Sequence, residues 1–522
     1  MAEKASSAFG NVLLLTAVGI VSQVIAFVYR IALSRLIGAE VLGIYQLIMP
    51  VYAVLLSLSA VGLSTAVSYL SARLQAVGDF RGVWQLRLLA LRLFFLLAIL
   101  PCGVILSVSD GISVLILGDA RTQLGLLLLL PCLLLTGIEN VQKHYFYGTG
   151  HVKPAALTEL AEQVIRSVLV LWLLYIFLPC SPEKAVGLIV LGMILCEIFS
   201  AAAQTILLRR QLSPGLRLRG EGKSRGFLLR ETARIAVPVA VTALLGNLMG
   251  AASSILIPRL LVRGGMEFGE AMEQFGVMFG MTIPLLFLPM AFLGSLNLVL
   301  APRLAASASL GRMERVRGQM RRSFSAVNVL LIGSLTLLAV MGLEIGPILY
   351  GDARVGQCIG ILAAGVLFNC WEGLLASCLG GLGCQAAAAR IALLADGIQL
   401  AITALTVGHP ALGLKGAAWA YALGGLVGAF LSWRRLSRET ALSLAAGDWL
   451  LLPLLGAAFA GICGKLLFAA AVGEGFAPMT AGLLCLGCGG ALYGLALQAM
   501  GISLKGVFFG EKKMLARLWK RR

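Results

Sequence analysis

Charged side chains are scarce in this sequence. Asp, Glu, Lys and Arg make up 13% of its 522 residues, whereas soluble domains carry about 25%. Long polar connections are absent too. The longest, residues 209–234, is shorter than the roughly 50 residues that the smallest domains need. Gly222-Lys223-Ser224 is similar to the end of a phosphate-binding loop, but Arg217 stands where its first glycine belongs. The sequence therefore excludes a soluble catalytic domain and ATP hydrolysis.

The groups of residues that hold metals or perform covalent catalysis are also missing. The three histidines, His144, His151 and His409, lack the spacing of a metal site. No Ser/His/Asp or Cys/His grouping is visible, and the 11 cysteines lie in apolar stretches without a disulfide pattern. Cys485 and Cys488 form a single Cys-x-x-Cys, away from any βαβ pattern. We therefore expect no catalytic residue, metal or cofactor, and a protein that is not an enzyme.

Hydrophobic residues dominate instead, at 59% with a mean hydropathy of +0.94. Apolar runs of about 20 residues follow one another, each long enough to cross a hydrocarbon core about 30 Å thick. Backbone groups in lipid must be satisfied internally, and unbroken runs without period-two alternation favour helices over a barrel. The sequence predicts an all-α integral membrane protein with about fourteen spans: 10–29, 43–70, 88–108, 123–146, 156–178, 185–208, 235–257, 275–301, 326–349, 356–380, 388–407, 412–433, 450–471 and 478–499.

The net charge of +18 is explained by topology. Short cytoplasmic loops carry an excess of Lys and Arg, and with the N-terminus inside, most basic clusters fall in internal loops. This predicts a cytoplasmic-membrane protein with both termini cytoplasmic, an uncleaved first helix and no nucleic-acid partner. Membrane lipids are expected partners, and contact of the basic tail, 501–522, with anionic headgroups is a secondary interpretation.

Two halves of the chain repeat each other. Gly118-Asp119-Ala120-Arg121 recurs as Gly351-Asp352-Ala353-Arg354, and at the same offset Glu139 corresponds to Glu372. Because six spans are an even number, both copies run the same way and should be related by an axis along the membrane normal. We expect a monomer with these parts: an N-terminal lobe 1–208, a basic linker 209–234, a C-terminal lobe 235–438, two additional spans in 439–500 and the tail 501–522.

Ionisable residues within spans are costly and mark candidate sites. Glu159, Glu162, Gln163 and Arg166 recur at helical i, i+3, i+4 and i+7 spacing in the fifth span. They either line a water-filled cavity, or Glu162 and Arg166 form a structural clasp against a neighbouring helix.

Other polar residues permit two interpretations each. Arg30 and Arg35 either snorkel to external headgroups or contact an anion at a cavity mouth. Glu139 and Glu372 either face each other between the lobes or serve helix packing. The remaining residues divide into cavity candidates (Asn247, Asn369 and Asp396) and isolated residues with expected packing or lipid-interface roles (Arg92, Glu197 and Lys465).

Several motifs carry a family resemblance. They are residues 22–30 (SQVIAFVYR), residues 33–40 (LSRLIGAE), residues 43–47 (GIYQL), Pro50-Val51-Tyr52, residues 62–68 (GLSTAVS) and Glu162-Gln163-x-x-Arg166. They resemble the stage V sporulation protein B group, oligosaccharide-lipid flippases of the multidrug/oligosaccharidyl-lipid/polysaccharide exporter superfamily and relatives of the lipid II flippase. Gln23 stands where the group usually has arginine, so one of its cavity cations is missing here.

The resemblance implies two six-span lobes around a central cationic cavity, plus two extra spans. It also implies alternating-access translocation of an undecaprenyl-diphosphate-linked oligosaccharide or peptidoglycan precursor, for cell wall, spore cortex or surface polysaccharide. The expected substrate-binding residues are Arg30, Arg35, Gln46, Glu139, Glu162, Gln163, Arg166, Asn247, Asn369 and Glu372.

Two other hypotheses stay open. A cation-coupled multidrug exporter of the same superfamily would have carboxylates dominating its cavity and twelve spans. A membrane-embedded glycosyltransferase or ligase would need acidic metal-binding motifs in an external loop or a large external domain.

Overall fold

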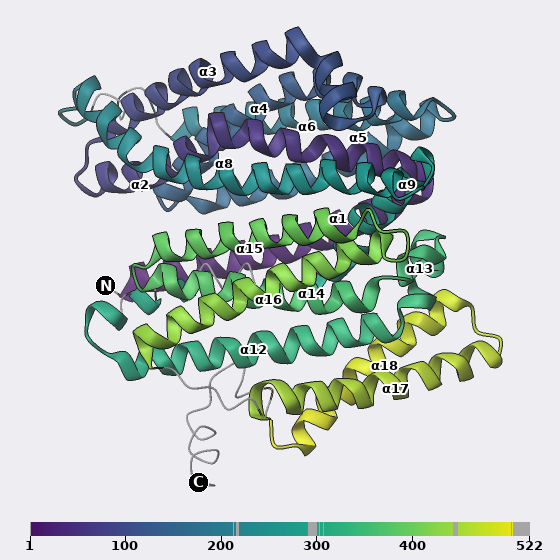
Figure 1. The fold of residues 1–522 in the computed structure, drawn as a ribbon. Helices are drawn as coiled ribbons and strands as arrows, with labels where there is room; N and C mark the ends of the chain where they lie inside the picture. Colours follow the sequence, from purple (N-terminus) through teal and green to yellow (C-terminus); the bar gives the residue numbers. More distant parts are fainter. Residues whose placement is uncertain are drawn as a thin grey trace. The chain divides into compact units, whose positions relative to one another are not determined.

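The structure is a computed structural model of the full chain. It describes residues 2–504 apart from 212, 214, 216–218, 291–299, 302, 306, 442–446 and 503, and side chains from Leu14 onward outside those gaps and 447–448. Every regular element in the described part is helical (Figure 1). The predicted basic tail lies outside the described residues, apart from its first residues. The chain forms two compact units, Met1–Gly276 and Val277–Arg522.

The first unit is built around a bundle in which α4 and α5 both pack on α6, α1 packs on α5, and α2 packs on α4 and α8. Its elements are α1 (Ala2–Leu56), η1 (Ser57–Val61), α2 (Gly62–Ala76), α3 (Phe80–Gly111), η2 (Ile112–Leu117), η3 (Ala120–Thr122), α4 (Gln123–Gly148), α5 (Val152–Phe177), α6 (Pro182–Gln211), α8 (Arg225–Arg263) and α9 (Phe268–Phe275). The π-helix η4 (Gly276–Thr282) begins at the last residue of this unit.

In the second unit α16 packs against α14 and α15, while α12 packs against α17, which pairs with α18. Its elements are α10 (Ile283–Phe287), η5 (Leu288–Met290), α12 (Met313–Val340), α13 (Gly342–Tyr350), η6 (Ala353–Gly356), α14 (Ile359–Gly381), α15 (Gln385–Thr406), α16 (Gly413–Thr440), η7 (Gly447–Leu451), α17 (Leu452–Gly473) and α18 (Pro478–Ala499). The units divide after Gly276, whereas the repeat places its lobe boundary at residues 209–234; that six-plus-six division stays a prediction.

Thirteen helices in the described residues are long and apolar enough to cross a membrane. One of them, Leu14–Ala76, is 63 residues long and covers the second predicted span and the first from residue 14 onward. At 1.5 Å per residue it is roughly three times as long as a hydrocarbon core is thick, so it provides two crossings. It bends at Gly38, whose φ of 75° and ψ of 178° leave the helical region and which only glycine adopts readily. Most of the remaining predicted spans fall on one helix, but the ninth, 326–349, crosses from α12 into α13. The eighth, 275–301, runs through consecutive helical turns up to Met290, and its residues 291–299 lie outside the described residues.

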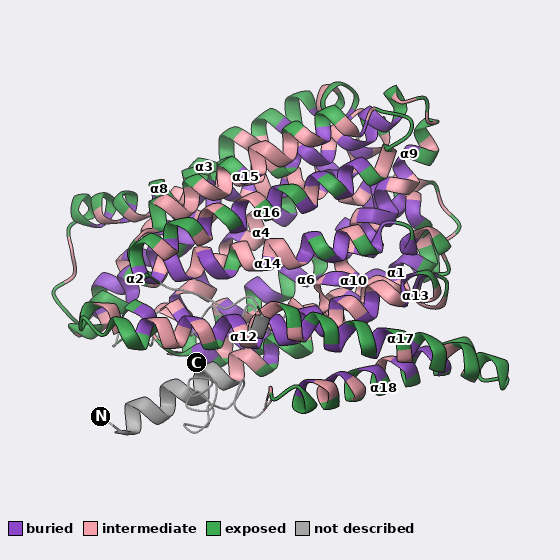
Figure 2. Cartoon of the chain, turned by 60° about the horizontal axis from the view of Figure 1, so that its bottom comes forward, coloured by how far each residue is buried: buried purple, intermediate pink, exposed green. Residues whose placement is uncertain are grey.

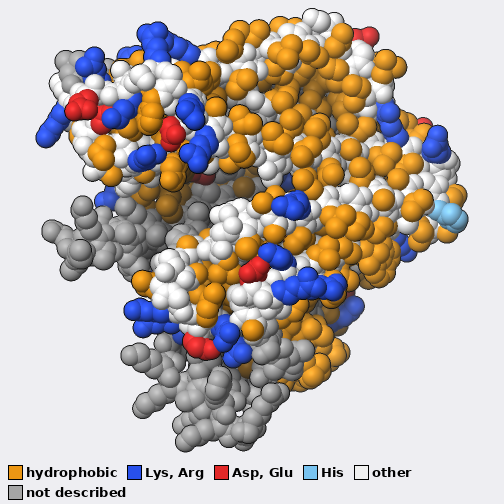
Figure 3. Space-filling model, turned by 60° about the vertical axis from the view of Figure 1, so that its left-hand side comes forward, with side chains coloured by type: hydrophobic (Ala, Val, Ile, Leu, Met, Phe, Trp, Pro, Cys, Tyr) orange, Lys and Arg blue, Asp and Glu red, His pale blue; other side chains and the backbone are white. Residues whose placement is uncertain are grey.

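Large hydrophobic side chains cover the outside of these helices. Along α3, Leu96, Ile99, Leu100 and Leu106 are 64 to 75% exposed, and Figure 2 shows exposed residues along the outer faces of many helices. In Figure 3, broad hydrophobic surface lies between patches of Lys and Arg. Soluble proteins rarely expose such continuous apolar surface, whereas lipid solvates it. The chain is a multi-pass membrane protein, as the hydropathy predicts.

The two copies of the repeated Gly-Asp-Ala-Arg motif have the same local structure. Gly118 and Gly351 both end a helix in the left-handed conformation, at φ 82° and 74°. Asp119 then accepts a hydrogen bond from the Arg121 amide at 3.0 Å and contacts its guanidinium at 2.9 Å. In the second copy Asp352 does the same with Arg354, at 2.8 Å in each case. Burial raises the pKa of Asp352, but the hydrogen bonds from Arg354 outweigh it and lower that pKa below its ordinary value.

We predict that Asp119→Ala destabilises the first unit by about 1–3 kcal/mol. The change removes the helix cap and frees Arg121, which also reaches Glu40 at 2.7 Å. Thermal unfolding of the purified protein in detergent measures the effect, with Asp110→Ala, an exposed residue nearby, as the matched control. Equal melting temperatures for the two variants would contradict the prediction.

Candidate functional site

A polar cavity of about 310 Å³ lies within the first unit. Helices α1, α4, α5 and α6 surround it, and most of the lining residues lie well inside these helices rather than at their ends. The lining residues are Ser22, Met49, Tyr52, Thr136, Glu139, Asn140, Lys143, Glu159, Glu162, Gln163, Arg166, Met193 and Glu197. Such a set of ionisable groups at bilayer depth needs internal compensation, because each costs at least about 2.5–3.5 kcal/mol in lipid.

Arg166 joins the carboxylates of two helices. Its Nη2 donates a hydrogen bond to Glu162 Oε1, one helical turn earlier on α5, and lies 3.6 Å from Glu197 Oε1 on α6. Glu162 Oε2 also accepts a hydrogen bond from the Ser200 hydroxyl at 3.2 Å. Glu162 and Glu197 are 7% and 3% exposed. The pairing with Arg166 compensates part of the cost of burying these two charges.

Lys143 on α4 likewise joins the carboxylates of two helices that line the cavity. Its Nζ lies 3.5 Å from Glu139 Oε1, one turn earlier on α4, and 3.3 Å from Glu159 Oε2 on α5. Glu159 Oε2 also accepts a hydrogen bond from the Tyr147 hydroxyl at 3.0 Å. Two cations thus hold four carboxylates.

Carboxylate oxygens outnumber the donors that reach them. The lining has a net formal charge of −2 when all six groups are ionised. Glu197 Oε2 and Glu139 Oε1 are buried and accept no hydrogen bond within the described residues. Buried acceptors of this kind favour a bound donor or cation. The resemblance implied a cationic cavity; the cavity observed in the first unit is instead mixed in sign with an acidic excess.

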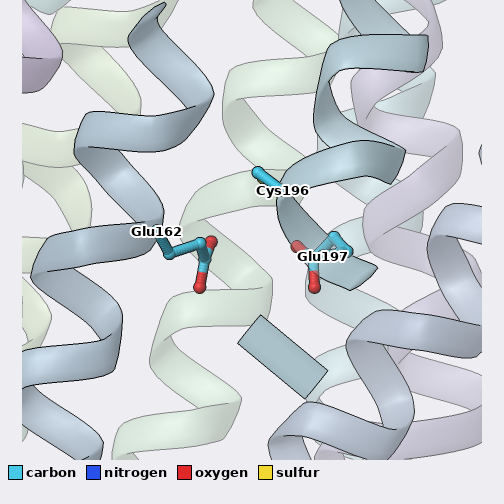
Figure 4. A group of neighbouring side chains, drawn as sticks. All are labelled: Glu162, Cys196 and Glu197. Atoms are coloured by element: carbon cyan, nitrogen blue, oxygen red, sulfur yellow. The ribbon is translucent and has the colours of Figure 1, made fainter. Parts of the chain in front are cut away.

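Figure 4 shows Glu162 and Glu197 extending toward each other from α5 and α6, with Cys196 beside them. Ligand atoms of these three residues lie within 4.8 Å of one another, as they would around a metal ion. However, the Arg166 guanidinium is bound to one oxygen of Glu162 and lies against one of Glu197. A second cation between the same oxygens would be repelled by it.

The structure brings together four of the predicted site residues: Glu139, Glu162, Gln163 and Arg166. The cavity and clasp interpretations of the fifth span are compatible, because Glu162 and Arg166 contact each other and also line the cavity.

Other predicted residues lie outside this lining. Arg30 is half-buried on α1 and interacts electrostatically with Tyr29 and Tyr45, and the Tyr45 hydroxyl donates to Met193 Sδ at 3.6 Å. Arg35 is exposed and Gln46 is half-buried. Asn247 on α8 instead binds α1 and η1, donating to the Ser57 hydroxyl at 2.5 Å and to the Ala53 carbonyl at 3.3 Å.

Asn369 and Glu372 belong to α14 in the second unit. The Asn369 amide donates to the Gly365 carbonyl at 2.9 Å, and the Glu372 carboxylate packs against Gly428 on α16. Glu372 interacts electrostatically with Asp396 on α15. Their substrate-binding roles stay predictions.

Glu197 is not isolated as expected, because its side chain reaches the cavity and lies beside Arg166, and its burial contradicts the lipid-interface alternative. Lys465 is not isolated either, since it lies 3.8 Å from Glu344 on α13. Lys143 was missed as well. Its signal was its position one turn after Glu139, which repeats the Glu162–Arg166 spacing on the next helix.

A family match and a curated relative both connect this chain with polysaccharide and spore-related proteins. Residues 9–306 match the family described as polysaccharide biosynthesis protein. Stage V sporulation protein B of Bacillus subtilis (strain 168) is 25% identical over 449 residues, 84% of this chain and 85% of that protein.

Solved structures share the fold at low identity. The lipid II flippase MurJ in an inward closed conformation matches 94% of this chain and 98% of its own, with a TM-score of 0.67 and 11% identity. An inward-facing multidrug resistance MATE transporter of the MOP superfamily matches 83% of this chain and all of its own, with a TM-score of 0.65 and 16% identity. The chain has the MOP-superfamily fold and belongs to the polysaccharide biosynthesis protein family.

Proposed function

We propose that this chain is a flippase that moves a polyprenyl-diphosphate-linked oligosaccharide or peptidoglycan precursor across the cytoplasmic membrane by alternating access. It acts as a transporter and not as an enzyme, as a monomer with both termini in the cytoplasm. The observation that carries the proposal is the polar cavity among α1, α4, α5 and α6, which Arg166 and Lys143 line from two helices long and apolar enough to cross a membrane.

The physical problem of flipping is the charged headgroup. An unpaired ion in hydrocarbon costs tens of kcal/mol in the Born limit. A cavity with water, hydroxyls and two cations removes most of that cost, while the apolar tail stays in lipid. An inside-negative potential adds about 2.3 kcal/mol per charge per 100 mV for an anion moving outward, so direction needs no ATP.

The acidic excess of the cavity supports a second candidate, a cation-coupled exporter of small cationic molecules. Four carboxylates against two cations suit a cationic ligand, and the MATE transporters share the fold. Against it stand the family match and α17 and α18, since an exporter of this kind is expected to have only twelve spans.

Reconstitution separates the two candidates. We expect the purified full chain in liposomes to move a polyprenyl-diphosphate-linked sugar between leaflets, read as the fraction of the lipid open to a membrane-impermeant glycan-modifying enzyme. Export of ethidium by the same liposomes under an imposed proton or sodium gradient tests the second candidate. Ethidium export without glycan-lipid movement would overturn the flippase proposal in favour of the exporter.

A further inference from the structure

The Glu162–Glu197 pair has an unfilled position for a proton. Both residues are more than nine-tenths buried, and both Oε1 atoms face the same nitrogen, Arg166 Nη2. The Ser200 hydroxyl donates to Glu162 Oε2. Glu197 Oε2 accepts no hydrogen bond among the described residues, although it is buried at the cavity. The Thr136 side chain of α4 also interacts with the Glu197 carboxylate, so Oε2 is the oxygen of the pair that is left for a proton.

The net charge of Glu162, Glu197 and Arg166 also favours a proton on Glu197 Oε2. Two carboxylates and one guanidinium leave the group at −1, and neighbouring carboxylates in a dry site share a proton rather than ionise together. Arg166 is the cation that favours the ionised form of each carboxylate against burial and their mutual repulsion. It is also one of two cations in the cavity available to a phosphate, which binds guanidinium groups strongly.

The surrounding groups do not replace Arg166 as a counter-charge. The other titratable side chains around Arg166 and the pair are Tyr29, Arg30, Tyr45 and Tyr52 of α1, Cys132, Glu139 and Lys143 of α4, and Cys196 of α6. Two of these described residues are cations. Lys143 is placed between Glu139 and Glu159, and Arg30 interacts with Tyr29 and Tyr45 rather than with Glu162 or Glu197.

We propose that the Glu162–Glu197 pair takes up a proton when a diphosphate headgroup in the cavity binds Arg166, so that anion and proton bind together. The inference rests on the proposed function. The proton comes from solution and forms an O–H bond on Glu197 Oε2 as the guanidinium turns from the carboxylates to the phosphate. The loaded site then carries one negative charge fewer than the headgroup alone would bring.

Calorimetry of binding in buffers of different ionisation enthalpy tests this linkage. The probe is geranyl diphosphate, added to the purified full-length protein at a pH where the diphosphate is fully ionised. We expect the wild type to take up about one proton per bound diphosphate, the share expected of two coupled carboxylates. Glu197→Gln, which removes the shared proton site, should bind with an uptake several-fold smaller. Glu183→Gln, at the far N-terminal end of α6, should behave as the wild type.

The experiment distinguishes failure of the proton linkage from failure of the flippase proposal. Binding by the wild type without proton uptake, or equal uptake by Glu197→Gln, would overturn the linkage and leave the flippase proposal intact. If geranyl diphosphate fails to bind the wild type at all, both proposals are wrong. The wild-type measurement decides the question even if Glu197→Gln does not fold.

Discussion

Replacing Arg166 by alanine is expected to abolish transport. The change leaves Glu162 and Glu197 buried without their shared cation, and removing one partner of a buried ion pair costs about 3–5 kcal/mol. It also removes one of the two cations available to the headgroup. Losing a buried charge contact with the headgroup costs about 2–5 kcal/mol, which corresponds to a loss of roughly 100-fold or more in translocation. The measurement is glycan-lipid movement in liposomes, with complementation of a deletion strain beside it.

A double variant separates a structural role from a functional one. In Arg166→Ala/Glu197→Gln the surplus charge is relieved, so we expect the amount of folded protein to recover while transport stays lost. Arg263→Ala, an exposed arginine at the end of α8, is the matched control and should transport normally. Recovery of transport by the double variant would show that Arg166 serves packing alone.

Gly276→Ala is expected to have the largest effect on folding. A methyl group there would lie 1.9 Å from the Ala39 carbonyl oxygen and 2.8 Å from the Gly43 amide nitrogen of α1. Both obstacles are backbone atoms of the same unit, so the crossing of α9 and α1 must widen. Overpacking typically costs about 1–3 kcal/mol and more where backbone must move, which lowers the amount of folded protein several-fold.

The same substitution at Gly269 on α9 is the control, because no atom lies within 4 Å of its added methyl group. Fluorescence-detected gel filtration of the two variants in detergent compares the folded fractions. A folded fraction of Gly276→Ala equal to that of Gly269→Ala would show that the crossing tolerates a side chain.

The membrane spans were predictable because the bilayer imposes a local rule on every segment. Each span needs its own run of apolar residues, and the predicted runs fall on the observed helices. The need for apolar runs does not determine how one span connects to the next. The first two spans are two helical segments that meet directly at Gly38, whose backbone leaves the helical region, and a sequence does not show whether such a glycine starts a loop or only a kink.

The cavity was predictable on one helix and not between helices. Glu162, Gln163 and Arg166 share a face of α5 through their spacing, which a sequence displays. Glu197 and Lys143 reach the same space from α6 and α4, and that depends on helix packing. The acidic excess was missed for this reason, since it appears only when the carboxylates of three helices are counted together.

Movement of a polyprenyl-linked glycan by this chain is tested most directly in cells that lack the protein. The fraction of each polyprenyl-linked glycan exposed on the outer leaflet is measured with a membrane-impermeant enzyme, before and after depletion. If the chain is the flippase, one such lipid accumulates on the inner leaflet, and wild-type protein, but not Arg166→Ala, restores its exposure. Unchanged outward exposure of every polyprenyl-linked glycan after depletion would contradict it.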